Sequence, residues 1–139
     1  MATVFASIDP HANPLQTSSQ SYVDIPGLAL NVSKYSNSLG LTALITLNVP
    51  APYASGNNFP GGNFIITTNL GEQLAYGAFT YSNKSPESYG RMPLTLIASY
   101  SLASNVSIIK AQWCNVRGST VHIDSYAAIS AVIQCGNLV

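Results

Sequence analysis

The two arginines are the residues of this chain best suited to holding an oxygen-rich ligand. Arg91 lies in "SYGRMP" and Arg117 in "NVRGS", and each has a glycine neighbour that lets the local backbone turn sharply. A guanidinium group presents a planar fork of donors that can hold two oxygens at once. Carboxylates, phosphates and vicinal sugar hydroxyls all fit this fork. A salt bridge with Glu87, Asp24 or Asp124 is an equally open structural role for either arginine.

The segment "HIDSY", residues 122–126, contains a histidine, an acid and a hydroxyl, but it does not predict a catalytic triad. In an extended strand His122, Asp124 and Tyr126 share one face, whereas Ser125 points to the opposite face. The hydroxyl would therefore point away from its base, and the sequence has no G-x-S-x-G motif. We expect Asp124 to accept hydrogen bonds from hydroxyls and His122 to be a structural residue.

The stretch "NVPAPYASGNNFPGG", residues 48–62, is predicted to be a loop. Three prolines stiffen it and three glycines permit tight turns. Tyr53 in such a loop offers a rigid contact surface and one hydroxyl at low entropic cost. Phe59 is explained better by packing against the end of the fold.

These parts favour carbohydrate recognition without a metal or other cofactor. A sugar offers hydroxyls to Arg, Asp, Ser and Thr, and C–H faces to Tyr. A calcium site needs clustered oxygen ligands, whereas the five acids of this chain lie far apart in the sequence. Its two cysteines and two histidines lack the spacing of a zinc site. A glycosidase, the enzymatic alternative, would need Glu87 and Asp124 to flank one bond.

The charge composition narrows the classes of partner. Charged residues make up 7% of the chain and the formal net charge is zero, against roughly 25% charged residues in an average soluble domain. This excludes the basic surface that nucleic-acid binding requires. Apolar residues reach 47%, but no run is long enough to cross a bilayer. Ser, Thr and Asn would keep such a surface polar; we favour the alternative, that part of the surface is buried against copies of the same chain.

Short runs of β-branched and aromatic residues alternate with Gly, Pro and Asn, which predicts an all-β sandwich or jelly roll. In residues 41–49 the apolar side chains alternate with polar ones, as in a strand with one buried face. We expect residues 1–20 to be an irregular arm and residues 21–139 to be a single domain. The predicted strands are residues 21–25, 28–32, 41–49, 63–69, 74–82, 94–102, 106–116 and 120–133.

Five blocks of the sequence resemble the fucose-binding, TNF-like lectin domain at the N-terminus of the Burkholderia superlectin. They are "SYVDIPGLALNV", "NVPAPYASGNNFPG", "FTYSNKSPESYGRMPLTL", "KAQWCNVRGS" and "HIDSYAAISA", and together they extend from Ser21 to Ala131. The resemblance implies a TNF-like jelly roll that assembles as a homotrimer. It also implies calcium-independent sites between neighbouring subunits, which bind L-fucose and fucosylated oligosaccharides of the blood-group or Lewis type. We expect no enzymatic activity, because nothing in the sequence places Glu87 and Asp124 face to face.

The same resemblance implies the binding residues. Arg91 and Arg117 match the family's pair of sugar-binding arginines, which would come from adjacent chains. The positions that match residues lining the sugar site, or lying near it, are Tyr53, Thr80, Tyr81, Ser88, Asp124 and Ser125. Two positions depart from the pattern: Asn63 stands where the family has a tyrosine, and Tyr89 where it has a threonine. Tyr89 either supplies a new stacking surface or fills surface space.

Some properties stay open at the level of sequence. The segment "MATVFASIDPHANP" lacks the features of a Sec signal peptide, so we expect either export by another route or a cytoplasmic location. Cys114 and Cys135 allow a disulfide or two free thiols. The competing function is a TNF-like trimer that docks a protein partner and binds no sugar.

Overall fold

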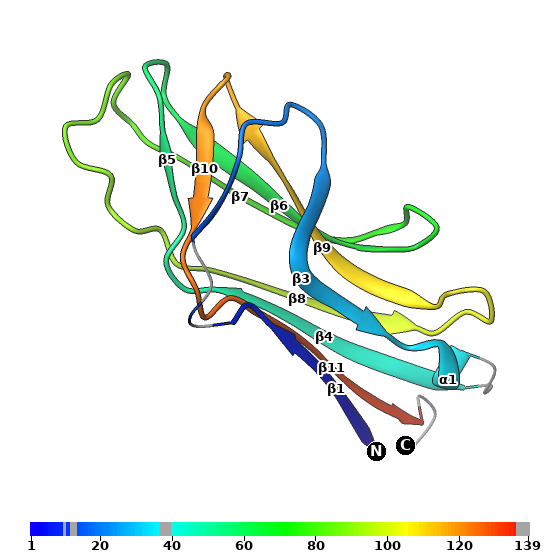
Figure 1. The fold of residues 1–139 in the computed structure, drawn as a ribbon. Helices are drawn as coiled ribbons and strands as arrows, with labels where there is room; N and C mark the ends of the chain where they lie inside the picture. Colours follow the sequence, from blue (N-terminus) through cyan, green and yellow to red (C-terminus); the bar gives the residue numbers. More distant parts are fainter. Residues whose placement is uncertain (10, 12–13, 37–39, 136–139) are drawn as a thin grey trace.

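The abundant β-branched and aromatic residues form strands, and the fold is an all-β sandwich, as predicted. The computed structural model describes residues 1–9, 11, 14–36 and 40–135. These residues form eleven strands in three antiparallel sheets, with one four-residue helix, α1 (Ser33–Ser36) (Figure 1).

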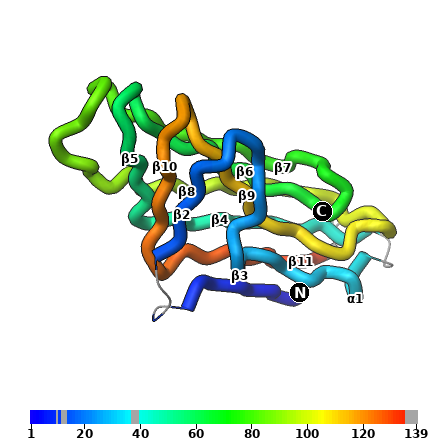
Figure 2. The backbone as a smooth tube through the Cα atoms, turned by 45° about the horizontal axis from the view of Figure 1, so that its top comes forward, coloured from blue at the N-terminus to red at the C-terminus, as the bar shows by residue number. Residues whose placement is uncertain are grey.

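Two four-stranded sheets form the layers of the sandwich, and a smaller sheet closes one end. The first sheet has the order β1 (Ala2–Ser7), β11 (Ala128–Cys135), β4 (Leu41–Val49) and β8 (Leu94–Ser101). The second sheet has the order β3 (Val23–Asn31), β9 (Ile108–Val116), β6 (Gly61–Thr68) and β7 (Gln73–Thr80). The end sheet has the order β2 (Leu15–Thr17), β10 (Thr120–Ile123) and β5 (Tyr53–Ser55). Figure 2 shows β2, β10 and β5 side by side at one end of the two layers.

The core lies between the two layers and is filled by alternate residues of their strands. In β4 the buried positions are Ala43, Ile45, Leu47 and Val49, which confirms the alternation predicted for residues 41–49. From the second sheet, Phe64 and Trp113 project into the same core, with ring centroids 6.1 Å apart. Burial of this apolar surface is the main stabilising contribution to the fold.

Several predicted strand boundaries were wrong, and each error has a physical cause. Residues 2–7 form β1 instead of an irregular arm, because they pair with β11, far away in the sequence. The predicted strands 21–25 and 28–32 are one strand, β3, with a register irregularity between Asp24 and Ala29. The predicted strand 120–133 is two strands in different sheets, β10 and β11, joined by a turn.

Gly61 marks a close backbone approach at the start of β6. A Cβ atom at this position would overlap the carbonyl of Phe79 and the side chain of Thr80 on the neighbouring strand β7. The side chain of Ser119 fixes the same point, because its hydroxyl lies 2.8 Å from the Gly61 carbonyl. These contacts bring the connection from β5 to β6 against the turn between β9 and β10.

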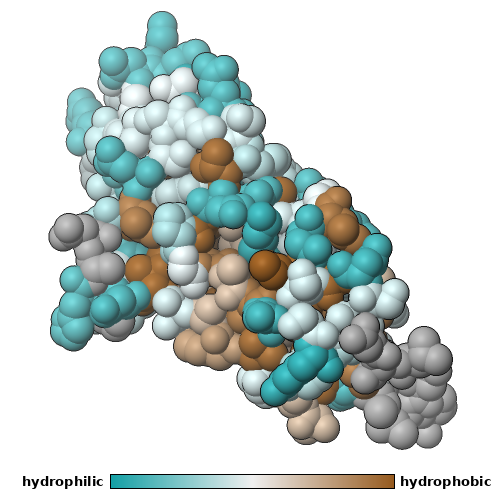
Figure 3. Space-filling model, turned by 45° about the vertical axis from the view of Figure 1, so that its right-hand side comes forward, coloured by the Kyte–Doolittle hydropathy of each residue, from teal (hydrophilic) through white to brown (hydrophobic). Residues whose placement is uncertain are grey.

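The end of the sandwich that carries these connections is hydrophilic. Figure 3 shows hydrophilic residues gathered at the top of the molecule, with apolar residues exposed lower on the same face. In the part of the chain that the structure describes, no helix is long and apolar enough to cross a membrane.

Candidate functional site

Two aromatic rings on neighbouring strands form the base of the candidate site. Tyr53 on β5 lies directly opposite His122 on β10 in the strand register, so their side chains project from the same face of the end sheet. The two rings stack with centroids 4.4 Å apart and an interplanar angle of 5°. Nε2 of His122 lies 3.1 Å from the hydroxyl of Ser55, two residues along β5. The sequence places Tyr53 in a loop, but strand pairing in fact fixes its orientation.

Arg91 reaches this base from the β7–β8 loop (residues 81–93). The backbone amide of Met92 donates a 2.9 Å hydrogen bond to the carbonyl of Pro52, which brings the end of the loop beside β5. The Arg91 guanidinium then lies over the Tyr53 ring, 4.0 Å from its centroid. Its Nη1 also lies 3.4 Å from the Ala51 carbonyl. The guanidinium is therefore held by a cation–π contact with the Tyr53 ring and by the carbonyl of Ala51, just before β5.

Asp124, immediately after β10, completes the polar part of the site. Nη2 of Arg91 lies 3.0 Å from Oδ2 of Asp124, and the two side chains are 45% and 36% exposed. The structural role left open for the arginine, an ion pair with Asp124, is thus present within one chain. An exposed pair of this kind contributes at most about 1 kcal/mol to stability. The fold does not depend on it, and both groups keep unused donors and acceptors toward solvent.

Two further tyrosines extend the rings around Arg91. The Tyr81 hydroxyl donates a 2.7 Å hydrogen bond to the Gly90 carbonyl, and partial burial raises the pKa of this hydroxyl above its usual 10.0. The Tyr89 ring lies 6.1 Å from that of Tyr81 and 6.4 Å from that of Tyr53. We call the rings of Tyr53, Tyr81, Tyr89 and His122 the aromatic cluster, and the cluster together with Arg91 and Asp124 the Arg91 site. The described part of the chain has no enclosed pocket here, and the site is an open surface.

The strand that contains "HIDSY" ends within this segment instead of continuing through it. The strand ends at Ile123, and Tyr126 has a φ of 79°, which is rare for a bulky residue. Asp124 lies near His122 and contacts Arg91, as the alternation predicts, whereas Tyr126 lies in the turn and is 68% exposed. Ser125, predicted to lie near the ligand, is half-buried in the same turn. Ser88, also predicted to line the site, is exposed in the β7–β8 loop.

Three other predicted residues lie outside the Arg91 site. Arg117 is in the turn between β9 and β10, where its φ is 51° and its Nη1 donates a 3.1 Å hydrogen bond to the Phe59 carbonyl. Asn63 is on β6, where it accepts a hydrogen bond from the Tyr76 hydroxyl at 3.3 Å. Thr80 is exposed at the end of β7. Among the described residues, no ion pair, hydrogen bond or ring contact joins Arg117 or Asn63 to Arg91.

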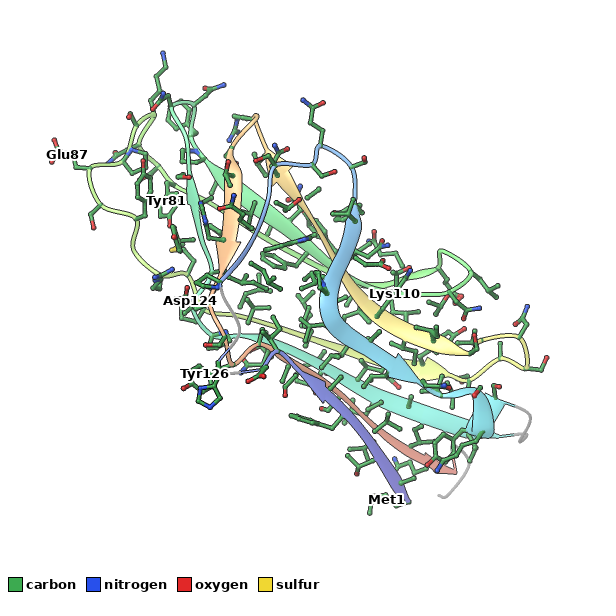
Figure 4. All side chains as sticks on the ribbon, in the orientation of Figure 1. Met1, Tyr81, Glu87, Lys110, Asp124 and Tyr126 are labelled. Atoms are coloured by element: carbon green, nitrogen blue, oxygen red, sulfur yellow. The ribbon has the colours of Figure 1, made fainter. Side chains whose placement is uncertain are left out.

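The carboxylates that a glycosidase would need do not face each other. Figure 4 shows Glu87 at the outer tip of the β7–β8 loop, turned away from Asp124, which lies at the base of the end sheet. Across residues 1–9, 11, 14–36 and 40–135, no three His, Cys, Asp or Glu side chains lie close enough to hold a metal ion. Cys114 is a buried free thiol, whereas the side chain of Cys135 lies outside the described residues.

The sequence pattern alone did not place His122 or Ser55 in this site. Their role depends on the pairing of β5 with β10, two strands separated by more than sixty residues. The period-two alternation around His122 showed which residues share its face, but not which side chain of another strand lies opposite. Only the three-residue strand β5, hidden in a segment rich in proline and glycine, supplies that partner.

We expect His122 to make the stability of the protein depend on pH. Burial lowers the pKa of its imidazole below the usual 6.5, with a further lowering by Arg91 that outweighs the opposite effect of Asp124. The folded state therefore favours neutral imidazole, while the unfolded chain takes up a proton below about pH 6.5. The contribution is present above pH 6.5 and is lost as pH falls through the folded pKa. Thermal unfolding should thus show a lower midpoint at pH 5 than at pH 7.5.

The matched variant for this prediction is His122→Gln, which is neutral at every pH. It should unfold with a smaller difference in midpoint between pH 7.5 and pH 5 than the wild type does. An unchanged difference would assign the pH dependence to other groups. Asp24 is not one of them, because hydrogen bonds from Gln112 and Lys110 hold the pKa of its carboxyl below 3.8.

Comparison with known proteins assigns this fold and sequence to a family. The solved structure described as "Structure of Eiger TNF from S. frugiperda" superimposes with a TM-score of 0.51 at 12% identity, over 94% of this chain and 90% of that chain. At this identity the likeness shows the fold alone, which is TNF-like. A xylanase from Clostridium thermocellum, the CBM22-1–GH10 modules of Xyn10B in complex with xylohexaose, matches at a TM-score of 0.42. It shares 13% identity over 99% of this chain and 25% of that one, and a likeness this weak carries no argument.

The sequence itself provides the stronger match. No curated protein matches it significantly. A family model described as "Bc2l-C, N-terminal domain" matches residues 12–132, which include the Arg91 site and nearly every strand. The chain therefore belongs to the family of the Bc2l-C N-terminal domain, a lectin-type family with a TNF-like fold.

Proposed function

We propose that this protein is a calcium-independent lectin that binds L-fucose and fucosylated oligosaccharides. The observation that carries the proposal is the Arg91 guanidinium, held at the surface between the Tyr53 ring and the Asp124 carboxylate. The guanidinium offers charge-assisted donors and the Asp124 carboxylate offers an acceptor to ligand hydroxyls, and the adjacent rings offer apolar surface to ligand C–H groups. Membership of a lectin-type family supports the same function.

We further propose that each site is completed by a neighbouring chain of a homotrimer. The sugar-binding residues implied by the family resemblance are divided in one chain between the Arg91 site and the region of Arg117 and Asn63. A neighbouring chain that presents its Arg117 region to the Arg91 site would bring the two arginines onto one ligand. A site shared in this way also explains why the Arg91 site is an open surface within one chain, because the neighbouring chain would cover it.

The outer face of the first sheet supports self-association. The four strands β1, β11, β4 and β8 contain no charged residue. Exposed on this face are Phe5 (65%), Leu44 (49%) and Ile97 (65%), among small hydroxyl and aliphatic side chains. The strand register places Phe5, Ser130, Thr46 and Ile97 in one row across the sheet. An uncharged, partly apolar sheet face is suited to burial against copies of itself.

A glycan array with and without a chelator tests the proposed function. Binding should require a fucose residue on the glycan and should persist in EDTA. Binding that ignores fucose, or that a chelator abolishes, would contradict the proposal. A TNF-like interaction module without sugar recognition, the competing function, would show no glycan binding while keeping its trimeric mass in sedimentation.

The shared site can be tested by mixing two variants. As pure proteins, Arg91→Ala and Arg117→Ala should each lose fucose binding, because every site then lacks one arginine. Trimers co-expressed from both chains should recover a part of the binding capacity. In some of their sites the intact Arg91 of one chain meets the intact Arg117 of the other. Titration calorimetry of the mixed trimers measures the recovered capacity, and the absence of any recovery would mean that the two arginines do not act across a subunit boundary.

A further inference from the structure

Tyr89 is the most exposed ring of the aromatic cluster, and its position is fixed by the fold. The ring is tilted by 35° to that of Tyr53 and meets that of Tyr81 edge-on at 68°. The backbone just after it is held at two points, by the Tyr81 hydroxyl on the Gly90 carbonyl and by the Met92 amide on the Pro52 carbonyl. Tyr89 is 38% exposed, whereas the other three residues of the cluster are half-buried. It is therefore not a freely moving surface side chain.

The other rings are already engaged by protein groups. The Tyr53 ring contacts both the Arg91 guanidinium and the His122 imidazole. Tyr81 packs edge-on against Phe79 at 5.9 Å and uses its hydroxyl on the backbone. Tyr89 is left with an outward surface and a hydroxyl that has no hydrogen-bond partner among the described residues. The apolar surface next to the arginine that is available to a ligand is thus mainly that of Tyr89.

On the basis of the proposed function, we infer that Tyr89 is a specificity-determining residue that binds the sugar unit next to the terminal fucose. The hydroxyls of the terminal sugar occupy Arg91 and Asp124, which are paired at 3.0 Å. The glycan then extends from this polar pair past the rim of the cluster, where Tyr89 offers its ring to the C–H face of the second unit. A ring that is held in place before binding loses little conformational entropy when the ligand stacks on it. The site should therefore favour fucosylated oligosaccharides over free L-fucose.

Titration calorimetry with two ligands tests this inference. In Tyr89→Ala, affinity for free L-fucose should stay within about twofold of the wild type, while affinity for a fucosylated trisaccharide should fall about fivefold to tenfold, the range expected for one lost aromatic contact. Tyr89→Phe keeps the ring and should keep the preference for the trisaccharide. The matched control, Tyr35→Ala, removes a tyrosine on α1 at the opposite end of the sandwich and should leave the ratio of the two affinities unchanged (Figure 1).

The outcomes separate this inference from the proposed function. If the wild type binds neither ligand, the proposed function fails and the inference fails with it. If the wild type binds both, equal losses for both ligands in Tyr89→Ala would place Tyr89 on the terminal sugar and overturn its assignment to the second unit. An affinity for the trisaccharide that Tyr89→Ala leaves unchanged would show that the ring does not touch the ligand.

Discussion

Arg91→Ala is expected to reduce the affinity for L-fucose about 100-fold or more, without changing the fold or the mass of the assembly. Arg91 presents the exposed cation of the site, and its guanidinium is oriented by the Tyr53 ring at 4.0 Å and by Asp124 at 3.0 Å. A hydrogen bond to a charged group is worth about 1.5–3 kcal/mol, and the guanidinium fork can hold two ligand oxygens. The loss of two such bonds corresponds to about 3–6 kcal/mol, or roughly two to four orders of magnitude in the dissociation constant.

Arg91→Ala should lose little free energy of unfolding compared with the binding free energy that it loses. The Arg91–Asp124 pair is exposed, and such pairs contribute at most about 1 kcal/mol. Circular dichroism and sedimentation should therefore match the wild type, so that calorimetry reports the binding effect alone. If Arg91→Ala dissociates the assembly instead, the arginine has a structural role and the proposed binding role is wrong.

Two further substitutions separate the role of the Arg91 guanidinium from that of positive charge on the loop. Arg91→Lys keeps the positive charge but loses the planar fork, so its affinity should lie between those of the wild type and Arg91→Ala. Lys84→Ala removes another exposed cation from the same loop and should leave the affinity unchanged. A similar loss in Lys84→Ala would point to a general effect of positive charge on the loop instead of a specific contact by Arg91.

The sequence predicted strands well where one face of a strand is buried and apolar and polar residues alternate along its whole length. Residues 41–49 are the example, since their alternation alone fixed both the element and its buried face. In residues 120–133 it predicted the buried residues but not the break between β10 and β11. Ile123 and Ala127 are both buried and four positions apart, so the alternation continues across a turn that contains no glycine or proline. Nothing in the residue type of Tyr126 indicates that its φ is positive.

Three residues of the Arg91 site could be predicted from the sequence, but their arrangement could not. Arg91, Tyr53 and Asp124 were identified from their chemistry and from the family resemblance. That they meet in one chain depends on the β7–β8 loop reaching β5 and on the pairing of Tyr53 with His122. Both are contacts between segments distant in sequence, which a local pattern does not encode. For the same reason β1 was missed, because its partner β11 lies at the other end of the chain.

Ile97→Lys is expected to convert the assembly into monomers. Ile97 is 65% exposed on the outer face of the first sheet, in the same row as Phe5, and the strands beneath it carry no charge. A lysine there would have to place its ammonium group in an interface that offers no acidic partner from these strands, and burying an unpaired charge costs several kcal/mol. Sedimentation should then show a fall from three times the chain mass to the 14.7 kDa of a single chain.

Leu70→Lys is the matched control for this substitution. Leu70 is 56% exposed in the turn between β6 and β7, away from the first sheet, so the same change of side chain should leave the mass unchanged. If Ile97→Lys keeps the mass of the wild-type assembly, the outer face of the first sheet is not the interface. A wild type that sediments as a single chain would contradict the homotrimer itself.

The Ile97→Lys monomer also separates a shared site from a site within one chain. Its Arg91, Tyr53 and Asp124 remain as they are in the wild type, because Ile97 contributes nothing to their contacts. If Arg117 of a neighbouring chain completes the site, the monomer should lose fucose binding about as severely as Arg117→Ala does. If the monomer instead binds L-fucose with wild-type affinity, the Arg91 site is sufficient by itself, and the division of predicted residues between two regions has another cause.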